Sequence, residues 1–344
     1  MRQIVITQSI REIADSYKNK VHAHEHYGDR NLLINPFRKL TTLKKAFEDN
    51  AVLEYDAASD SFHPLADNER FVQYLELVIQ QYNADLLVLM PAEYENRISE
   101  YESILPQNRM TTVLRVRHQT PQMFHVLLCS ALMYTDIRAW ILPRYIRATG
   151  VKCCVYCNAN YAITDDSGHA YYTVDHWKPK SRYPYLCTSF YNLVPCCFTC
   201  NNNKNDDDRE LFGLYVDSEA TGDDLFRFVI DDTDYATYLL THDKDCLNIR
   251  FNATSGKYAD LQANMNDVFH IEAIYQEHKD VAEEVLWKRK IYNASNIDSL
   301  NDAFADLHMS QSEVARFILG TYPSPDELHK RPLTKLMQDI FRQK

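Results

Sequence analysis

Seven of the nine cysteines of this 344-residue chain lie between Cys153 and Cys200. Two C-x-x-C pairs occur there, and a gap of two residues selects Cys154 with Cys157 and Cys197 with Cys200. Two such turns complete the tetrahedral thiolate shell that zinc prefers. An odd, crowded set of cysteines disfavours a secreted disulfide framework, in which cysteines are spread out and paired. The sequence therefore predicts one structural zinc site that closes both ends of the segment.

Two alternatives to this ligand set stay open on the sequence. Cys153 and Cys196 directly precede the chosen pairs and could serve as ligands in their place. Four buried cysteines that bind no metal would also produce the same sequence pattern. We expect Cys129, Cys187 and Cys246 to be small core residues, because free cysteine packs well.

The gap between the two pairs is roughly twice the 15–20 residues of an ordinary zinc ribbon, so a folded element must fill it. It contains Asp175-His176 and then Asn192-Leu193, and Asn201 with Lys204 follows the second pair. Carboxylate and amide oxygens, here from Asp175 and Asn201, are ligands that suit Mg²⁺ or Mn²⁺. The imidazole of His176 suits proton abstraction from water near neutral pH. The combination indicates phosphodiester hydrolysis.

The remaining polar residues of this group have expected supporting roles. Asn192 would bond either the ring of His176 or the local backbone and so fix the imidazole. Lys204 would lie one helical turn from Asn201, on the same face and near the phosphate. For the backbone, we predict strands at Ala170–Val174 and Asn192–Val194, and a helix after Cys200 that is capped by residues 201–203.

These motifs, in this order, resemble the HNH endonucleases of the ββα-metal fold, in the branch with a four-cysteine zinc site. The resemblance covers about 55 of the 344 residues. It implies that His176 is the general base, that Asp175 and Asn201 hold one catalytic Mg²⁺ or Mn²⁺, and that Asn192 supports His176. Asn201 stands where the last histidine of the family name would be. The implied products carry a 5′ phosphate and a 3′ hydroxyl.

A longer phrase carries a finer resemblance. Asp175-His176-x-x-Pro179-Lys180-Ser181, followed by Tyr183-Pro184, is similar to the HNH subunit of Septu-type anti-phage systems. Those subunits act beside an ATPase, so the resemblance implies an ATPase partner and a role in antiviral defence. A double-strand cut needs two copies of a one-metal site, so a homo-oligomer is a further expectation.

Around this segment, hydrophobic periodicity predicts an α+β protein: a mostly helical chain with an embedded zinc-stapled ββα-metal (HNH) nuclease module. We divide it into a helical region (1–150), the module (151–215), and a strand pair followed by helices (216–344). The expected helices are Leu40–Phe47, Arg70–Tyr82, Gln122–Ile146, Val268–Tyr292, Ile297–Leu319 and Pro325–Phe341, and the expected strand pair is Leu225–Ile230 with Leu247–Phe251.

Charge limits how such a chain meets a polyanion. The net charge is −11, which disfavours coating of nucleic acid by the whole surface. A local patch is sufficient for an enzyme, and we expect phosphate contacts from Lys178, Lys180, Arg182 and Lys204. No apolar run approaches the eighteen or so residues of a membrane span, and the N-terminus lacks signal-peptide features. The chain is therefore expected to be cytoplasmic, without membrane contact.

Other functions remain open at this level. A non-catalytic zinc module that binds nucleic acid or protein would explain the cysteines, but not Asp175-His176 together with Asn201. A structural subunit with a vestigial site and a ribonuclease that acts on structured RNA are further alternatives to the favoured DNA nuclease. Trp177 suits either stacking on a base or wedging the loop.

Overall fold

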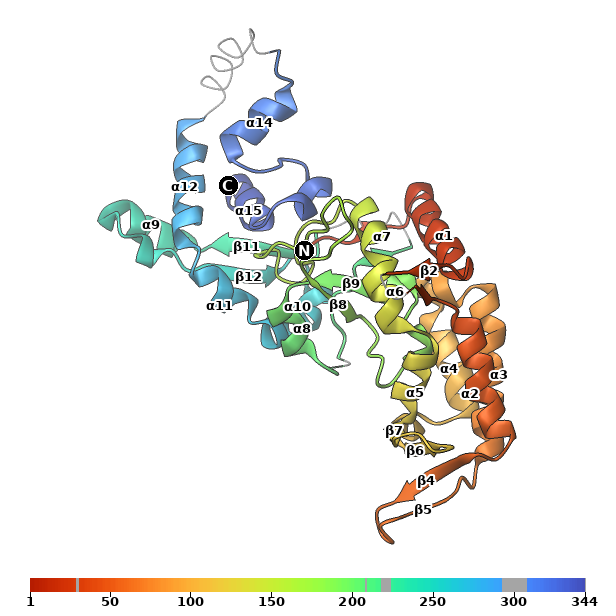
Figure 1. Cartoon of the computed structure of the whole chain (residues 1–344). Helices are drawn as coiled ribbons and strands as arrows, with labels where there is room; N and C mark the ends of the chain where they lie inside the picture. Colours follow the sequence, from red (N-terminus) through yellow and green to blue (C-terminus); the bar gives the residue numbers. More distant parts are fainter. Residues whose placement is uncertain (29–30, 208, 218–223, 293–307, 344) are drawn as a thin grey trace.

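The computed structural model of the chain describes residues 1–28, 31–207, 209–217, 224–292 and 308–343. A helical N-terminal part and a C-terminal part lie on opposite sides of a central hairpin and helix (Figure 1). The architecture is α+β, with small sheets among many helices, as the sequence predicted. Among the described residues, no helix has the length and apolar character needed to cross a membrane.

The N-terminal part is a helical body with one small sheet. Its second helix begins at Pro36, and the side chain of Asn35 caps it by accepting from Arg38 N. This helix packs on the third and fifth helices around Phe47, Phe71 and Phe124. The helices are α1 (Gln8–His22), α2 (Pro36–Glu48), α3 (Asn68–Ala84), α4 (Tyr94–Ile104), α5 (Phe124–Ala131), α6 (Tyr134–Trp140) and α7 (Leu142–Ala148).

Several short strands of this part were not predicted. β2 (His26–Tyr27) pairs with β3 (Leu32–Leu33). A four-stranded sheet has the order β5-β4-β6-β7. Its strands are β4 (Val52–Asp56), β5 (Ser61–Pro64), β6 (Val113–Val116) and β7 (Gln122–Met123).

The single helix predicted over Gln122–Ile146 is wrong, because three short helices occupy this stretch. Met133 adopts φ 54°, a left-handed conformation that ends α5 and redirects the chain into α6. A second break at Ile141 precedes α7, whose first turn contains Pro143. The spacing of apolar residues continues through both breaks, so periodicity alone did not reveal them.

The cysteine-rich segment contains two strands and a helix, in the predicted order. β8 (Thr173–His176) pairs antiparallel with β9 (Leu193–Cys196), so that Asp175 faces Val194 and His176 faces Leu193. Helix α8 (Phe198–Lys204) follows, with Cys197 at its N-cap. The expectation that residues 201–203 cap this helix is wrong, because they lie inside it.

The C-terminal part begins after β10 (Tyr215–Val216), which pairs in parallel with β1 (Ile4–Val5) near the start of the chain. The predicted strand pair is confirmed as β11 (Phe226–Ile230) and β12 (Ile249–Ala253), which are antiparallel. The helices are α9 (Asp232–Thr241), α10 (Ala259–Phe269), α11 (Ile271–Gln276), α12 (Lys279–Ile291), α14 (Gln311–Leu319) and α15 (Thr334–Arg342).

Two of the long helices predicted here are interrupted. Left-handed His270 (φ 52°) separates α10 from α11, and left-handed Leu333 (φ 60°) separates a 3₁₀ turn at Pro325–Lys330 from α15. Much of the predicted helix at Ile297–Leu319 lies outside the described residues.

Candidate functional site

The four cysteines chosen from their spacing come together at the base of the β8–β9 hairpin. The Sγ atoms of Cys154, Cys157, Cys197 and Cys200 all lie within 4.8 Å of one another, and those of Cys157 and Cys197 are 4.0 Å apart. A tetrahedral zinc site with Zn–S bonds of 2.3 Å needs Sγ separations of about 3.8 Å. The cluster therefore fits a zinc ion, which would join the loop before β8 to the first turn of α8.

The shifted alternatives lie outside this cluster. Cys153 forms an isolated β-bridge with Tyr161, and burial raises the pKa of its thiol to about 12. The Sγ of Cys196 lies 3.7 Å from the carbonyl oxygen of Thr173, within the hairpin. Both thiols are buried groups with their own packing, so the two C-x-x-C pairs form the cluster that could hold a metal ion.

The C-terminal part holds the first cysteine pair in place. The hydroxyl of Tyr275 on α11 donates to the carbonyl of Cys157 at 2.7 Å. Asn158, at φ 53°, accepts from Lys335 N through Oδ1 and donates to the carbonyl of Leu328. The backbone oxygen of Asn158 accepts from Leu333 N at 2.7 Å. The four-cysteine cluster thus rests on the C-terminal helices as well as on its own hairpin.

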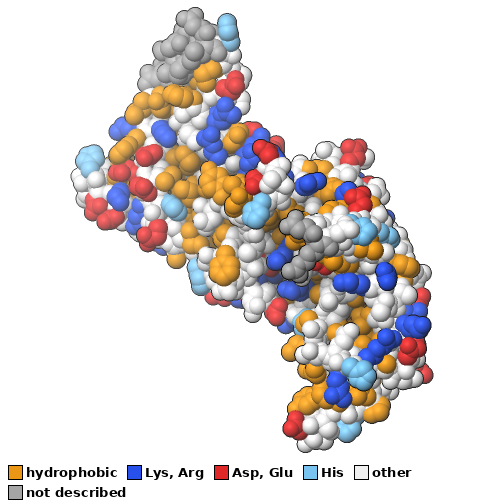
Figure 2. Space-filling model, in the orientation of Figure 1, with side chains coloured by type: hydrophobic (Ala, Val, Ile, Leu, Met, Phe, Trp, Pro, Cys, Tyr) orange, Lys and Arg blue, Asp and Glu red, His pale blue; other side chains and the backbone are white. Residues whose placement is uncertain are grey.

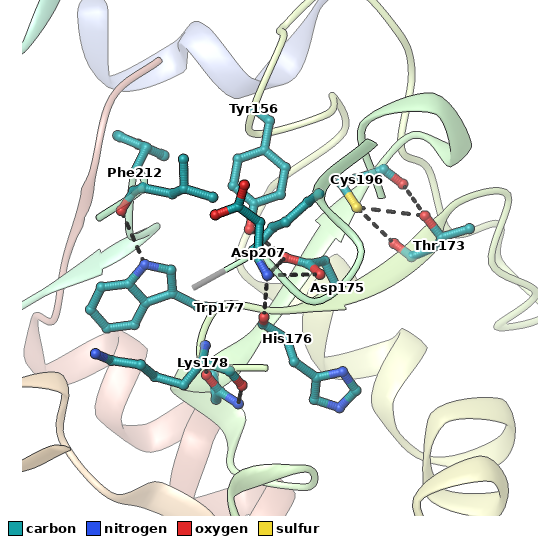
Figure 3. A network of polar contacts seen from close by, with 12 residues as sticks. Tyr156, Thr173, Asp175, His176, Trp177, Lys178, Cys196, Asp207 and Phe212 are labelled. Atoms are coloured by element: carbon teal, nitrogen blue, oxygen red, sulfur yellow. Dashed lines mark hydrogen bonds and ion pairs between the residues drawn. The ribbon is translucent and has the colours of Figure 1, made fainter. Parts of the chain in front are cut away.

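Asp175 sits in a buried polar cluster beneath α8 (Figure 3). Its Oδ2 accepts from the hydroxyl of Tyr156 at 2.6 Å and lies 3.1 Å from Nζ of Lys204. Burial raises the pKa of Asp175, and the positive charge of Lys204 and the hydroxyl of Tyr156 oppose that rise. The ring of Tyr156 stacks on Phe269 of α10, with centroids 4.5 Å apart.

The structure corrects the expectation that Lys204 contacts the phosphate. Its side chain is 1% exposed, and its ammonium group donates to the backbone oxygen of His176 at 2.7 Å as well as to Asp175. Lys204 therefore fastens α8 to β8 from inside. Its position in the last turn of α8 was predicted correctly, but the group it binds is the carboxylate of Asp175.

His176 points away from Asp175, on the other side of β8 (Figure 3). Its Nε2 lies 3.1 Å from the carbonyl oxygen of Cys187, which can only accept, so Nε2 carries the proton and Nδ1 is left as an acceptor. The ring of Tyr134 covers it at a centroid distance of 4.6 Å, and His176 is 4% exposed. Burial, assisted by the charge of Lys180, lowers the pKa of His176 to about 3. The imidazole is therefore neutral at ordinary pH.

Asn192 binds the local backbone, which is one of the two roles left open by the sequence. Its Oδ1 accepts from Lys178 N at 2.7 Å, and its Nδ2 donates to the carbonyl oxygens of Lys178 and Leu186 at 3.1 and 3.2 Å. It is fully buried. Asn192 thereby fixes the loop that leaves β8, and with it the approach to His176.

The two expected metal ligands are Asp175 and Asn201, which is half-buried on α8, one turn before Lys204. A carboxylate offers about four acceptor positions. Tyr156 and Lys204 occupy up to three of them on Asp175. The backbone N–H of His176 bonds the same carboxylate, so a divalent cation shared with the amide oxygen of Asn201 would have to displace one of these partners. The structure does not bring the imidazole of His176 to this pair.

The basic residues after His176 differ in their surroundings. Lys178 forms an ion pair with Glu95 at 2.7 Å, and its ammonium lies 5.5 Å from the ring centre of Trp177. Lys180 is exposed, and Arg182 is half-buried. Trp177 itself donates to the carbonyl of Leu211 and packs on Tyr94. Its ring is thus held as a wedge between the hairpin and the helical body.

Comparison with known proteins places this geometry in a family. Residues 154–207 match the family model described as HNH endonuclease. This segment is an HNH endonuclease domain. The chain is also 30% identical over 80 residues to the Septu protein PtuB of Bacillus thuringiensis, an alignment that covers 22% of this chain and 30% of that relative. No solved structure shows a significant match to the chain.

Sequence reasoning missed three tyrosines that shape the HNH domain. Tyr156 binds Asp175, Tyr134 covers His176, and Tyr275 binds the carbonyl of Cys157. Tyr156 had a detectable feature, because it lies between the two cysteines of the first pair. Tyr134 and Tyr275 lie far away along the chain, and nothing in their neighbourhood marks them.

Proposed function

We propose that the chain is a metal-dependent HNH endonuclease that hydrolyses phosphodiester bonds in nucleic acid, with DNA as the favoured target. One observation carries the proposal: the ring of His176 is held by its Nε2–H on the carbonyl of Cys187, which leaves Nδ1 as a proton acceptor. This ring sits on the hairpin of a segment that matches the HNH family model. A ring nitrogen that is free to accept a proton is one requirement of a general base.

In the proposed reaction, Nδ1 of His176 takes a proton from water while the water oxygen attacks the phosphorus. The bond from phosphorus to the 3′ oxygen breaks, which leaves a 5′ phosphate and, after protonation, a 3′ hydroxyl. Asn192 acts as a positioning residue, because it holds the loop that joins His176 to β9. Lys180 and Arg182 are proposed to contact the backbone phosphates, together with Lys178 once it leaves Glu95.

Two metals complete the proposal. The four cysteines would hold a structural zinc ion, and Asp175 with Asn201 would hold Mg²⁺ or Mn²⁺. When bound, the divalent ion would stabilise charge on the phosphoryl and leaving oxygens as a Lewis acid, which requires β8 to bend so that Asp175 and His176 face one phosphate. Because Tyr134 covers His176, we expect α6 to move before nucleic acid reaches the ring.

The likeness to the Septu protein PtuB supports a role in anti-phage defence. We propose that the chain acts in the cytoplasm as the nuclease of a defence complex with an ATPase partner, and that it assembles as a homo-oligomer when it cuts both strands. The covered imidazole of His176 is consistent with an activity that a partner releases.

The direct test is cleavage of supercoiled plasmid and of structured RNA with added Mg²⁺ or Mn²⁺. His176→Ala removes the base, and His176→Gln keeps an amide donor for the carbonyl of Cys187. We expect both variants to lose cleavage by at least about 100-fold while retaining zinc. The control is His63→Ala, which removes an exposed imidazole of β5. Cleavage that survives both His176 variants would refute the assignment of the base.

The main rival is a zinc module that binds nucleic acid or protein without catalysis. It predicts full zinc content, binding of a partner, and no cleavage with any metal. The RNA alternative stays within the same chemistry, and the plasmid and RNA arms of the assay distinguish it from the DNA nuclease.

A further inference from the structure

One cavity on the helical N-terminal part is basic, although the chain as a whole is acidic. It has a volume of about 450 Å³ and lies between α2, α5 and the turn from β6 to β7. Arg38, Lys39 and Arg117 line it, and none of its fourteen lining residues is acidic. In a chain with a net charge of −11, this local excess of three positive charges marks a surface suited to an anion.

These cations are available for a ligand. Arg38, Lys39 and Arg117 are all exposed. Within the described part of the chain, no carboxylate forms an ion pair with Arg38 or Lys39. Arg117 has one pair, with Asp49 at 3.5 Å, in which both side chains are about half exposed. Such an exposed pair contributes little energy and exchanges readily for a phosphate.

A second cavity connects the first cavity to the HNH domain, and we call the two together the groove. Its volume is about 310 Å³, and it shares Lys39 and Ser130 with the first cavity. Tyr134 and Lys180 line its other side, and Asp136 is its acidic lining residue. Tyr134 is the residue whose ring covers His176 at 4.6 Å. A route of exposed cations therefore runs from Arg117 past Lys39 to Lys180, and it ends beside the proposed base.

The surface view agrees with this arrangement. Lys and Arg side chains gather on the face of the N-terminal part that carries α2 and α5 (Figure 2; elements in Figure 1). Amide side chains of Gln119 and Gln122 also line the first cavity and add uncharged donors. Arginine, lysine and amide groups together are the usual contacts to phosphate oxygens of nucleic acid.

We infer that this groove, lined by Arg38, Lys39 and Arg117 and continued by Lys180, binds the phosphodiester backbone of the nucleic-acid strand that is cut at His176. The inference rests on the proposed endonuclease function and adds a binding site for its substrate outside the HNH domain. It also explains how an acidic chain holds a polyanion, because the helical body provides the attraction that the small domain lacks.

The test compares two lysines of the same helix. Lys39 lines both cavities, whereas Lys45 is exposed on α2 and lines neither. Fluorescence anisotropy of a labelled single-stranded DNA is measured with the full chain, without added divalent metal. We expect Lys39→Glu to weaken binding about tenfold and to reduce the salt slope by about 0.7, the value for one lost phosphate contact. Lys45→Glu should change the affinity less than about twofold, because salt screens distant charges.

Arg117→Glu is the second variant, and it should weaken binding as Lys39→Glu does. Equal effects of Lys39→Glu and Lys45→Glu, or no binding of any probe, would overturn the inference. Duplex DNA and RNA oligonucleotides distinguish the nucleic acid that the groove accepts. Polyglutamate that binds more tightly than these, with the same dependence on Lys39, would also overturn it in favour of an acidic protein partner.

The groove and the nuclease can fail separately. If binding depends on Lys39 but no metal supports cleavage, the groove stands and the endonuclease proposal fails. If cleavage requires His176 but Lys39→Glu binds and cleaves like Lys45→Glu, the endonuclease stands and the groove fails.

Discussion

Nζ of Lys204 lies 3.1 Å from Oδ2 of Asp175, and the two side chains are 1% and 6% exposed. The same ammonium donates to the backbone oxygen of His176. One lysine thus ties the last turn of α8 to the two adjacent residues from which the proposed chemistry starts. Moving two charges out of water is costly, so each depends on the other once the hairpin has folded.

Lys204→Met should destabilise the protein by about 3–5 kcal/mol, because it leaves the carboxylate of Asp175 buried without its cation. Urea unfolding measures the change. The double variant Asp175→Asn with Lys204→Met should cost less than the sum of the single changes, because neither charge is then left alone. Lys45→Met is the exposed control, expected within about 0.5 kcal/mol of the wild type. A Lys204→Met variant as stable as that control would contradict the pairing.

The zinc cluster gives a second prediction, which separates adjacent cysteines. Cys154→Ala should abolish zinc binding, whereas Cys153→Ala should keep one zinc ion per chain, because its thiol lies outside the cluster. Elemental analysis of the purified variants measures the metal. Chelation of zinc from the wild type should lower its melting temperature, since binding of the ion is coupled to folding of the segment. Zinc loss in both variants alike would mean that the ligand set is shifted.

The sequence was most informative where the residue types and their spacing are restricted by metal binding or by strand alternation. The clustering of Cys154 and Cys157 with the second cysteine pair, the order of strand, strand and helix, and the antiparallel pair β11–β12 all follow from spacing and alternation. The breaks at Met133 and His270 did not, because a residue other than glycine in a left-handed conformation has no reliable mark in the sequence.

The candidate site was predicted in its residues but less well in its contacts. Lys204 was expected to contact phosphate because it is basic and follows Asn201. In the structure its side chain is buried and forms an ion pair with Asp175. Adjacent residues of a strand point to opposite faces, so Asp175 and His176 could serve metal and water at one site only if the chain bends there, and β8 sends them to different sides (Figure 3). Tyr134 covers His176 through a contact across more than forty residues, which no local pattern reveals.

Asn192 offers a third prediction about the hairpin loop. Asn192→Asp keeps the shape and the acceptor for Lys178 N, but places an oxygen where Nδ2 now donates to the carbonyls of Lys178 and Leu186. Loss of two buried hydrogen bonds should destabilise the fold by at least about 2 kcal/mol. Thermal or urea unfolding measures the loss, with Asn202→Asp on the exposed side of α8 as the control.

The same variant separates positioning from substrate binding. Asn192→Asp should lower the rate of cleavage more than it lowers the affinity for nucleic acid, because Asn192 contacts backbone inside the loop. A variant that loses affinity but cleaves bound substrate at the wild-type rate would assign Asn192 to binding instead.

The fourth prediction concerns His329, which is 7% exposed and donates through Nε2 to the carbonyl of Arg2 at 2.8 Å. Burial, with the nearby charges of the N-terminal amino group and of Arg2, lowers the pKa of His329 from 6.5 to about 4. Above pH 6.5 the imidazole is neutral in both the folded and the unfolded chain, so its contribution to stability is complete. As the pH falls from 6.5 to 4, only the unfolded chain takes up the proton at this imidazole. The free energy of unfolding should therefore fall by about 3 kcal/mol. His329→Gln keeps an amide donor for the carbonyl of Arg2 and does not titrate, so its stability should fall less steeply in this window. Urea unfolding at several pH values between 6.5 and 4 measures how the free energy of unfolding depends on pH in both proteins. His63→Gln is the exposed control. If wild type and His329→Gln lose stability equally over this range, the buried ring does not resist protonation.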